Sequence, residues 1–173
     1  MYLKMTGSIL VFVSAVACGF LYGEQFRIRI RRLQALRQIL SLLKGEIRCC
    51  RNTLAEIFRR LAGRTEPPFD GWLLGMALEM QQQNGKSFRL LWKEWTDRVL
   101  IGCGLKEADL QFLSELGGQI GYLDAQMQEE VLEQAVGQLD AEILKLSAGL
   151  SERQRICRVL GVSVGLLIVI VLI

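Results

Sequence analysis

The chain has 173 residues, of which 51% are hydrophobic and 23% charged, and it carries a net charge of +3 with no histidine. This length suits a single domain, and the absence of histidine removes the commonest general base of enzymes. Residues 24–64 hold 11 basic and 3 acidic side chains, net +8, whereas residues 65–145 hold 6 and 14, net −8. A chain that coats nucleic acid is more uniformly basic, so no nucleic-acid partner is expected.

Residues 1–23 are predicted to form an N-terminal transmembrane helix. The 18 residues from Met5 to Tyr22 are uncharged, and as a helix they rise about 27 Å, close to the roughly 30 Å of the hydrocarbon core. A cleaved signal peptide is the alternative, because Ala15, Ala17 and Cys18 fit a small-residue or lipobox-like cleavage site.

Residues 159–173 are predicted to form a second, C-terminal transmembrane helix. Arginines cluster on the inner side of both apolar segments, and few positive charges lie beyond them. Such charges tend to stay cytoplasmic. The pattern therefore predicts a cell-membrane protein with both termini outside and residues 24–158 as a cytoplasmic helical bundle. The membrane-flanking residues, which we expect to contact anionic lipid, are Arg27, Arg29, Arg31, Arg32, Arg153, Arg155 and Arg158.

The cytoplasmic segment begins with a predicted helix that continues from the first span to about Ala62. Apolar residues recur at heptad spacing along it, and the consecutive prolines Pro67 and Pro68 then exclude a helix. The main series is Leu33, Leu40, Ile47, Leu54 and Leu61.

Shorter helices follow. Residues 69–85 and 87–100 read as a helical hairpin with Ser87 as an N-cap, and residues 104–121 as a helix that ends among its glycines. Asp124 is the predicted N-cap of a last helix that reaches the C-terminus, with Leu132, Leu139 and Leu146 in a heptad stripe. The fold class is therefore all-α, a membrane-anchored helical bundle whose two long helices pair antiparallel and continue into a transmembrane hairpin.

No catalytic, cofactor-binding or metal-ligating residues are predicted. The five cysteines form no zinc-site spacing, and an acidic group on the last helix is better explained as a solvated face. Trp72, Trp92 and Trp95 either pack the core or line a groove for a partner. The protein is thus predicted not to be an enzyme, and a transporter is disfavoured because the apolar ends hold few polar side chains.

The chain resembles the stage III sporulation protein AB family of endospore-forming bacteria over nearly its whole length. The resemblance rests on "RRLQALRQILSLLKGEI", "TLAEIF", "LWKEW" and "LGGQIGYLDAQMQ". The family tends to have Thr-Pro-Leu where this chain has Asn52-Thr53-Leu54. This difference favours an uninterrupted first helix here.

The resemblance implies a component of the complex that links the mother cell to the forespore, located in the mother-cell membrane. The family is similar to the inner-membrane platform protein of type II secretion and type IV pilus systems. The implied partners are a secretion-type ATPase and other membrane components of the channel. The expected mechanism is mechanical coupling, with Trp72, Trp92, Lys93, Glu94 and Trp95 as candidate ATPase contacts. The alternative is a self-associating coiled-coil membrane scaffold, a homo-oligomer that does not bind an ATPase.

Overall fold

The structure, a computed structural model, describes residues 26–48, 53–82, 85–121 and 124–172, with side chains as far as residue 149. These residues form helices and turns and contain no strand, which confirms the all-α prediction. They divide into two compact units, one of Arg31–Ile143 and one of Met1–Ile30 with Leu144–Ile173. In the second unit the described backbone is helical throughout, at residues 26–30 and from Leu144 to Leu172.

Within the described part of the chain, no helix is both long enough and apolar enough to cross a bilayer. The predicted N-terminal span, residues 1–23, lies outside the described residues. The predicted C-terminal span belongs to the last helix as far as Leu172, but its side chains lie outside the described part. Both spans therefore stay predictions.

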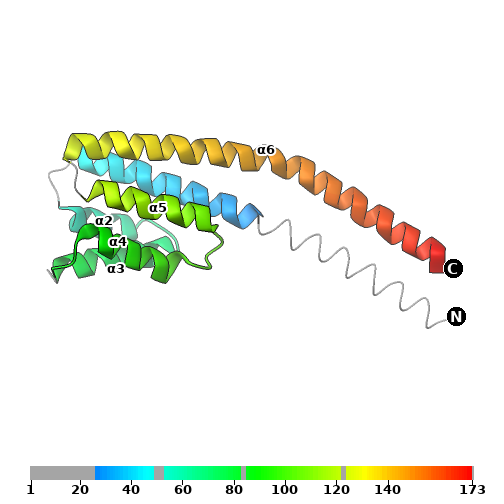
Figure 1. The fold of residues 1–173 in the computed structure, drawn as a ribbon, viewed down its shortest axis with the longest axis horizontal. Helices are drawn as coiled ribbons and strands as arrows, with labels where there is room; N and C mark the ends of the chain where they lie inside the picture. Colours follow the sequence, from blue (N-terminus) through cyan, green and yellow to red (C-terminus); the bar gives the residue numbers. More distant parts are fainter. Residues whose placement is uncertain (1–25, 49–52, 83–84, 122–123, 173) are drawn as a thin grey trace. The chain divides into compact units, whose positions relative to one another are not determined.

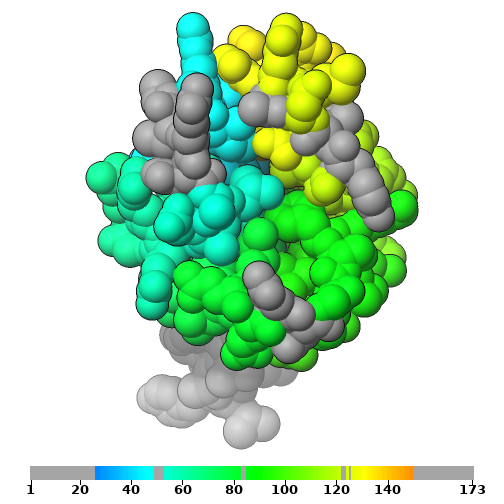
Figure 2. Space-filling view, turned by 90° about the vertical axis from the view of Figure 1, so that its left-hand side faces the viewer, coloured from blue at the N-terminus to red at the C-terminus, as the bar shows by residue number. Residues whose placement is uncertain are grey.

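Two long helices pair in the unit Arg31–Ile143, as the heptad stripes predict. The first helix is described over residues 26–48, and helix α6 (Ala125–Leu172) begins beside its end (Figures 1 and 2). The Asp124 side chain caps α6 by accepting a hydrogen bond from the Met127 backbone N–H at 2.9 Å. The paired helices bury apolar side chains from both stripes, including Leu33, Leu36, Leu40, Leu43, Leu132 and Leu139.

Ion pairs on the rim of this helix pair show that it is antiparallel. Arg37 binds Asp140 at 3.0 Å, Lys44 lies 3.8 Å from Glu133, and Arg48 lies 3.6 Å from Glu129. Each step forward on the first helix is matched by an equal step backward on α6. The acidic residues of α6, which the sequence analysis explained as a solvated face, thus provide partners for basic residues of the first helix. These pairs are partly exposed, so each contributes at most about 1 kcal/mol.

The first helix does not continue to Ala62, so that prediction was wrong. Thr53 has an extended backbone, with φ −68° and ψ 150°, and it begins a new helix, α2 (Leu54–Ala62). The Thr53 hydroxyl accepts a hydrogen bond from the Glu56 N–H at 3.4 Å, and the Glu56 carboxylate accepts one from the Thr53 N–H at 3.2 Å. This reciprocal capping box satisfies N–H groups at a helix start and therefore stabilises a break at Thr53.

Helices α3 (Phe69–Gln81) and α4 (Phe88–Trp95) form the predicted hairpin, with Ser87 capping α4. A π-helix, η1 (Thr96–Leu100), follows, and helix α5 (Glu107–Ile120) runs through Gly117 and Gly118 and ends at Gly121. In the view of Figure 1, helix α5 lies between the pair of long helices and α4. Helix α2 contacts the first helix directly, because Arg60 Nη1 lies 2.8 Å from Glu46 Oε2. Two turns of the short helices are fastened to the first helix by one side chain, because Arg32 donates hydrogen bonds to the carbonyls of Pro67 and Cys103 at 2.6 and 3.2 Å.

Candidate docking surface

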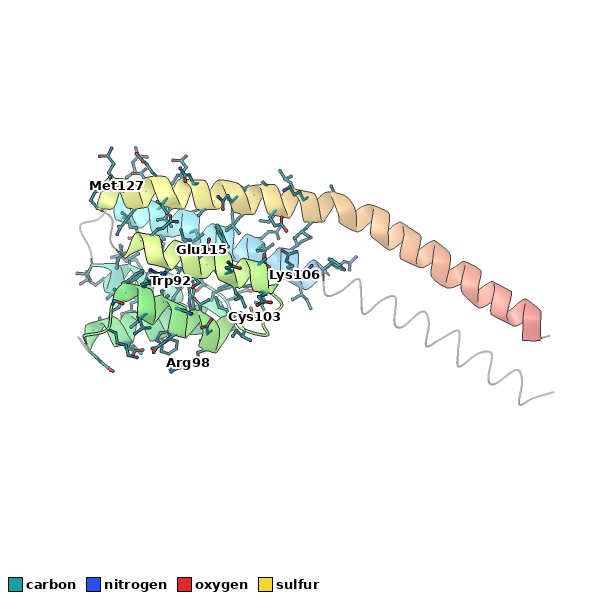
Figure 3. The ribbon with its side chains drawn as sticks, in the orientation of Figure 1. Trp92, Arg98, Cys103, Lys106, Glu115 and Met127 are labelled. Atoms are coloured by element: carbon teal, nitrogen blue, oxygen red, sulfur yellow. The ribbon has the colours of Figure 1, made fainter. Side chains whose placement is uncertain are left out.

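Two of the predicted partner contacts, Trp72 and Trp92, belong to the core. Both are fully buried, and their rings meet edge to face with centroids 4.9 Å apart. Trp92 Nε1 donates a hydrogen bond to the Leu113 carbonyl at 2.7 Å and so joins α4 to α5, as the position of Trp92 in Figure 3 shows. Of the two readings of these tryptophans, core and partner groove, the structure supports the core for Trp72 and Trp92.

Trp95 lies at the edge of this core and is partly exposed. A Cβ atom on Gly75 would lie 2.2 Å from the Trp95 ring, so only glycine leaves space for the ring against α3. Trp95 Nε1 donates to the Glu79 carboxylate at 2.7 Å, and the Arg98 guanidinium lies 5.0 Å from the ring centroid. Arg98 is therefore placed for a cation–π interaction on the outer side of the hairpin.

Lys86 joins the two helices of the hairpin by ion pairs with Glu79 on α3 and Glu94 on α4. Its Nζ atom lies 2.8 Å from Glu79 Oε1 and 2.7 Å from Glu94 Oε2. The hydrogen bond from Lys86 lowers the pKa of Glu79 most, and the hydrogen bond from Trp95 lowers it further. In turn, the hydrogen bonds that Lys86 donates to Glu79 and Glu94 raise the pKa of Lys86. The charges of this group are largely satisfied within the hairpin.

One side of α4 remains available to a partner, and we call it the α4 face: Leu90, Lys93 and Glu94. These residues are three and four positions apart and therefore share a helical face. Leu90 is 48% exposed, Lys93 is exposed and Glu94 is half-exposed. The predicted contacts Lys93 and Glu94 thus lie together, with Trp95 beside them.

A second surface was missed by the sequence reasoning. We call it the α3 face: Gly71, Leu74 and Leu78. Leu74 is 42% and Leu78 is 44% exposed. The available signal was that α3 carries apolar residues on both sides, since its opposite side buries Phe69, Trp72 and Met76 and only Asp70 and Glu79 are charged. A helix that is apolar all round is usually covered on all sides.

The predicted membrane-flanking arginines have different surroundings. Arg27 and Arg31 are exposed, Arg29 is buried with 6% of its surface exposed, and Arg32 binds the two carbonyls described above. The side chains of Arg153, Arg155 and Arg158 lie outside the described part.

Comparison with known proteins gives one consistent result. The family model described as "Stage III sporulation protein AB (spore_III_AB)" matches residues 4–173. The chain is 22% identical over 170 residues to the stage III sporulation protein AB of Bacillus subtilis (strain 168), covering 98% of this chain and 99% of that protein. A solved structure of a stage III sporulation protein AB has a similar fold, with a TM-score of 0.65 and 19% identity over 72% of this chain and 97% of that structure. Because the family model covers nearly the whole sequence, this chain belongs to the stage III sporulation protein AB family.

Proposed function

We propose that this protein is a non-enzymatic platform of a secretion-like sporulation complex that links mother cell and forespore. Its two apolar ends anchor it in the mother-cell membrane with residues 24–158 in the cytoplasm. There it couples a secretion-type ATPase to the membrane components of the channel. The observation that carries the proposal is helix α6, which runs without interruption from Ala125 to Leu172.

The long helices suit mechanical coupling. A helix of 48 residues is about 72 Å long at 1.5 Å per residue. Within Arg31–Ile143 it is joined to the first helix by buried leucines and by three ion pairs. Packed helices transmit displacement because their interiors are close-packed and hardly compressible. Both helices leave this unit at the same end, since Arg37 is paired with Asp140. The chain leads from that end to both apolar segments.

The short helices supply the surface for the ATPase. We assign the contact to the α4 face, where an exposed leucine lies between charged side chains. An apolar anchor with charged neighbours is a common composition for a specific interface. Arg32 ties turns on either side of α3, α4 and η1 to the first helix. A force applied at the α4 face therefore reaches the long helices.

The test measures binding of the purified ATPase to full-length protein in lipid vesicles by co-flotation. The double variant Leu90→Gln with Lys93→Glu should bind at least about tenfold more weakly, because both the apolar anchor and a charge are altered. The matched control changes the exposed pair on α6, Leu144→Gln with Lys145→Glu, and should bind like the natural chain. Equal binding by the α4-face variant would exclude this contact, and absence of ATPase binding by the natural chain would favour the scaffold alternative.

A further inference from the structure

Arg32 binds both ends of one segment of the chain. Its Nη1 atom donates a hydrogen bond to the Pro67 carbonyl at 2.6 Å, and its Nε atom donates one to the Cys103 carbonyl at 3.2 Å. Residues 68–102, which we call the hairpin segment, lie between these two carbonyls in the chain and form α3, α4 and η1. One guanidinium therefore closes the hairpin segment at its base, the end at which Figure 3 labels Cys103.

The turn at Cys103 has a backbone suited to this contact. The glycines on either side of it, Gly102 and Gly104, have φ angles of 82° and 99°, which residues with a side chain rarely adopt. The Cys103 N–H donates a hydrogen bond to the Leu100 carbonyl at 3.4 Å, so η1 ends in a tight turn. The Cys103 carbonyl lies outside the helices and accepts its hydrogen bond from Arg32. The two glycines thus shape the turn so that it presents this carbonyl to the first helix.

Arg32 differs from its neighbour Arg31, which is exposed. Arg32 is partly buried, and its Nε and Nη1 atoms both donate to backbone carbonyls. Hydrogen bonds from a charged donor are stronger than those between neutral groups. Arg32, which the sequence groups with the membrane-flanking arginines, is therefore engaged inside the unit Arg31–Ile143.

The first helix reaches other parts of this unit by different side chains. Glu46 binds Arg60 of α2, and Arg37 binds Asp140 of α6. Arg32 instead binds the two turns that flank the hairpin segment, which carries the α4 face. Arg32 is therefore a direct polar link between the first helix and the surface assigned to the ATPase.

The hairpin segment is also held together internally. Lys86 pairs with Glu79 of α3 and with Glu94 of α4, and the Trp95 ring packs against α3 at Gly75. Close-packed interiors of this kind resist deformation. A displacement applied at the α4 face is therefore carried through the hairpin segment to its base.

We propose that Arg32 is a positioning residue for coupling, which holds the base of the hairpin segment against the first helix. Through this contact a displacement at the α4 face reaches the first helix. The inference rests on the proposed function, because it assumes that the ATPase binds the α4 face. Loss of Arg32 should therefore leave ATPase binding intact and weaken the response of the first helix.

The first measurement is the rate at which N-ethylmaleimide labels Cys103, a partly buried thiol in the turn that Arg32 holds. The full chain is used in lipid vesicles with its other cysteines replaced. Arg32→Gln should label at least about threefold faster, because loss of a hydrogen bond from a charged donor makes local opening more frequent. Arg32→Lys keeps the charge but has its donors on one atom, so a smaller increase is expected.

Arg64→Gln is the matched control, because it removes one positive charge from an exposed arginine near Pro67. This variant should label at the rate of the natural chain. Circular dichroism of each variant measures whether the helices are retained. If Arg32→Gln loses helix content, Arg32→Lys takes its place in both measurements.

The second measurement separates ATPase binding from coupling. Gln38→Cys, at an exposed position of the first helix, carries an environment-sensitive fluorophore in a chain whose native cysteines are replaced. Addition of the purified ATPase with ATP should change the fluorescence when Arg32 is present. With Arg32→Gln the ATPase should still bind within about twofold of the natural affinity in co-flotation, while the fluorescence change should be at least about threefold smaller. A merely structural role of Arg32 would lower binding and fluorescence change together.

Each outcome decides one step. Equal labelling of Cys103 in Arg32→Gln and in the natural chain overturns the closure of the hairpin segment. Loss of ATPase binding by Arg32→Gln, or an undiminished fluorescence change at position 38, overturns the role in coupling. A natural chain that does not bind the ATPase refutes the proposed function and with it the coupling, whereas the labelling of Cys103 still decides whether Arg32 closes the segment.

Discussion

The indole ring of Trp92 occupies the place where a side chain on Gly117 would begin. A Cβ atom at Gly117 would lie 2.1 Å from Trp92 Cδ1, far inside van der Waals contact. Trp92 is itself fully buried and bonded to the Leu113 carbonyl, so the ring has little freedom to move. Helix α5 therefore keeps a glycine in mid-helix to admit a ring from α4.

Gly117→Ala should destabilise the protein by about 2–3 kcal/mol, because the added methyl group overpacks a rigid core. The measurement is urea unfolding of the full chain in mild detergent, followed by circular dichroism. The control is Gly137→Ala on α6, where a Cβ atom meets nothing within 4 Å among the described residues. That change should stabilise the helix by about 1 kcal/mol. A neutral Gly117→Ala would show that Trp92 can be displaced at low cost.

Thr53→Ala should cost about 1 kcal/mol, because it removes the hydroxyl that caps α2. Unfolding by urea measures the loss. Glu56→Gln is the control, since a glutamine side chain still accepts a hydrogen bond from the Thr53 N–H. Glu56→Gln should therefore cost less than Thr53→Ala, and an equal loss would show that the Glu56 charge contributes as much as the Thr53 hydroxyl.

Stability should fall in acid through Glu79. Its pKa in the folded chain is lowered from 4.5 by hydrogen bonds from Lys86 and Trp95. The unfolded chain thus binds the proton more readily, and the contribution of Glu79 is present above pH 4.5 and lost as the pH falls below that value. The thermal midpoint of Glu79→Gln should therefore drop less than that of the natural chain between pH 6 and about pH 3. Glu130→Gln, a change at an exposed α6 residue, should leave the natural slope intact.

Arg37→Glu should lower stability by about 1 kcal/mol or less, since the pair with Asp140 is half-exposed. Adding Asp140→Arg should restore most of the loss by re-forming the pair in reverse. Double-mutant analysis of unfolding at low and high salt measures the coupling. Arg37 donates two hydrogen bonds to Asp140, from Nε to Oδ1 at 3.0 Å and from Nη2 to Oδ2 at 3.2 Å. A coupling energy of zero would mean that this bidentate contact makes no contribution in solution.

The heptad stripes allowed the long helices to be predicted from the sequence. Leu33, Leu40, Leu132 and Leu139 recur every seven residues, and all four are buried in the structure. The same regularity caused the error at Thr53, because Leu54 and Leu61 continue the spacing across a break. Thr53 and Glu56 fit the Thr-x-x-Glu pattern of a capping box, which the sequence shows. An argument from the spacing of apolar residues does not detect such a helix start. Local hydrogen bonds stabilised the break despite the continuing stripe.

The candidate docking surface was harder to predict from the sequence than the long helices. Spacing places Trp92 and Trp95 on one face of a helix, but it does not reveal which of them the rest of the chain covers. That depends on Gly75 and Gly117, which are distant in sequence and make room for the two rings. Leu74 and Leu78 were missed for a related reason. Helix α3 has no polar side that would indicate which face is exposed.

The three ion pairs between the long helices also determine how those helices align. Their spacing is unequal, seven residues from Arg37 to Lys44 and four from Lys44 to Arg48, and it is mirrored at Asp140, Glu133 and Glu129. Sliding one helix past the other by a turn or by a full heptad breaks all three pairs and places at most one of the three basic residues opposite an acidic one. Leucine stripes alone repeat every seven residues and tolerate such a slip. The charges remove this ambiguity and specify a single register.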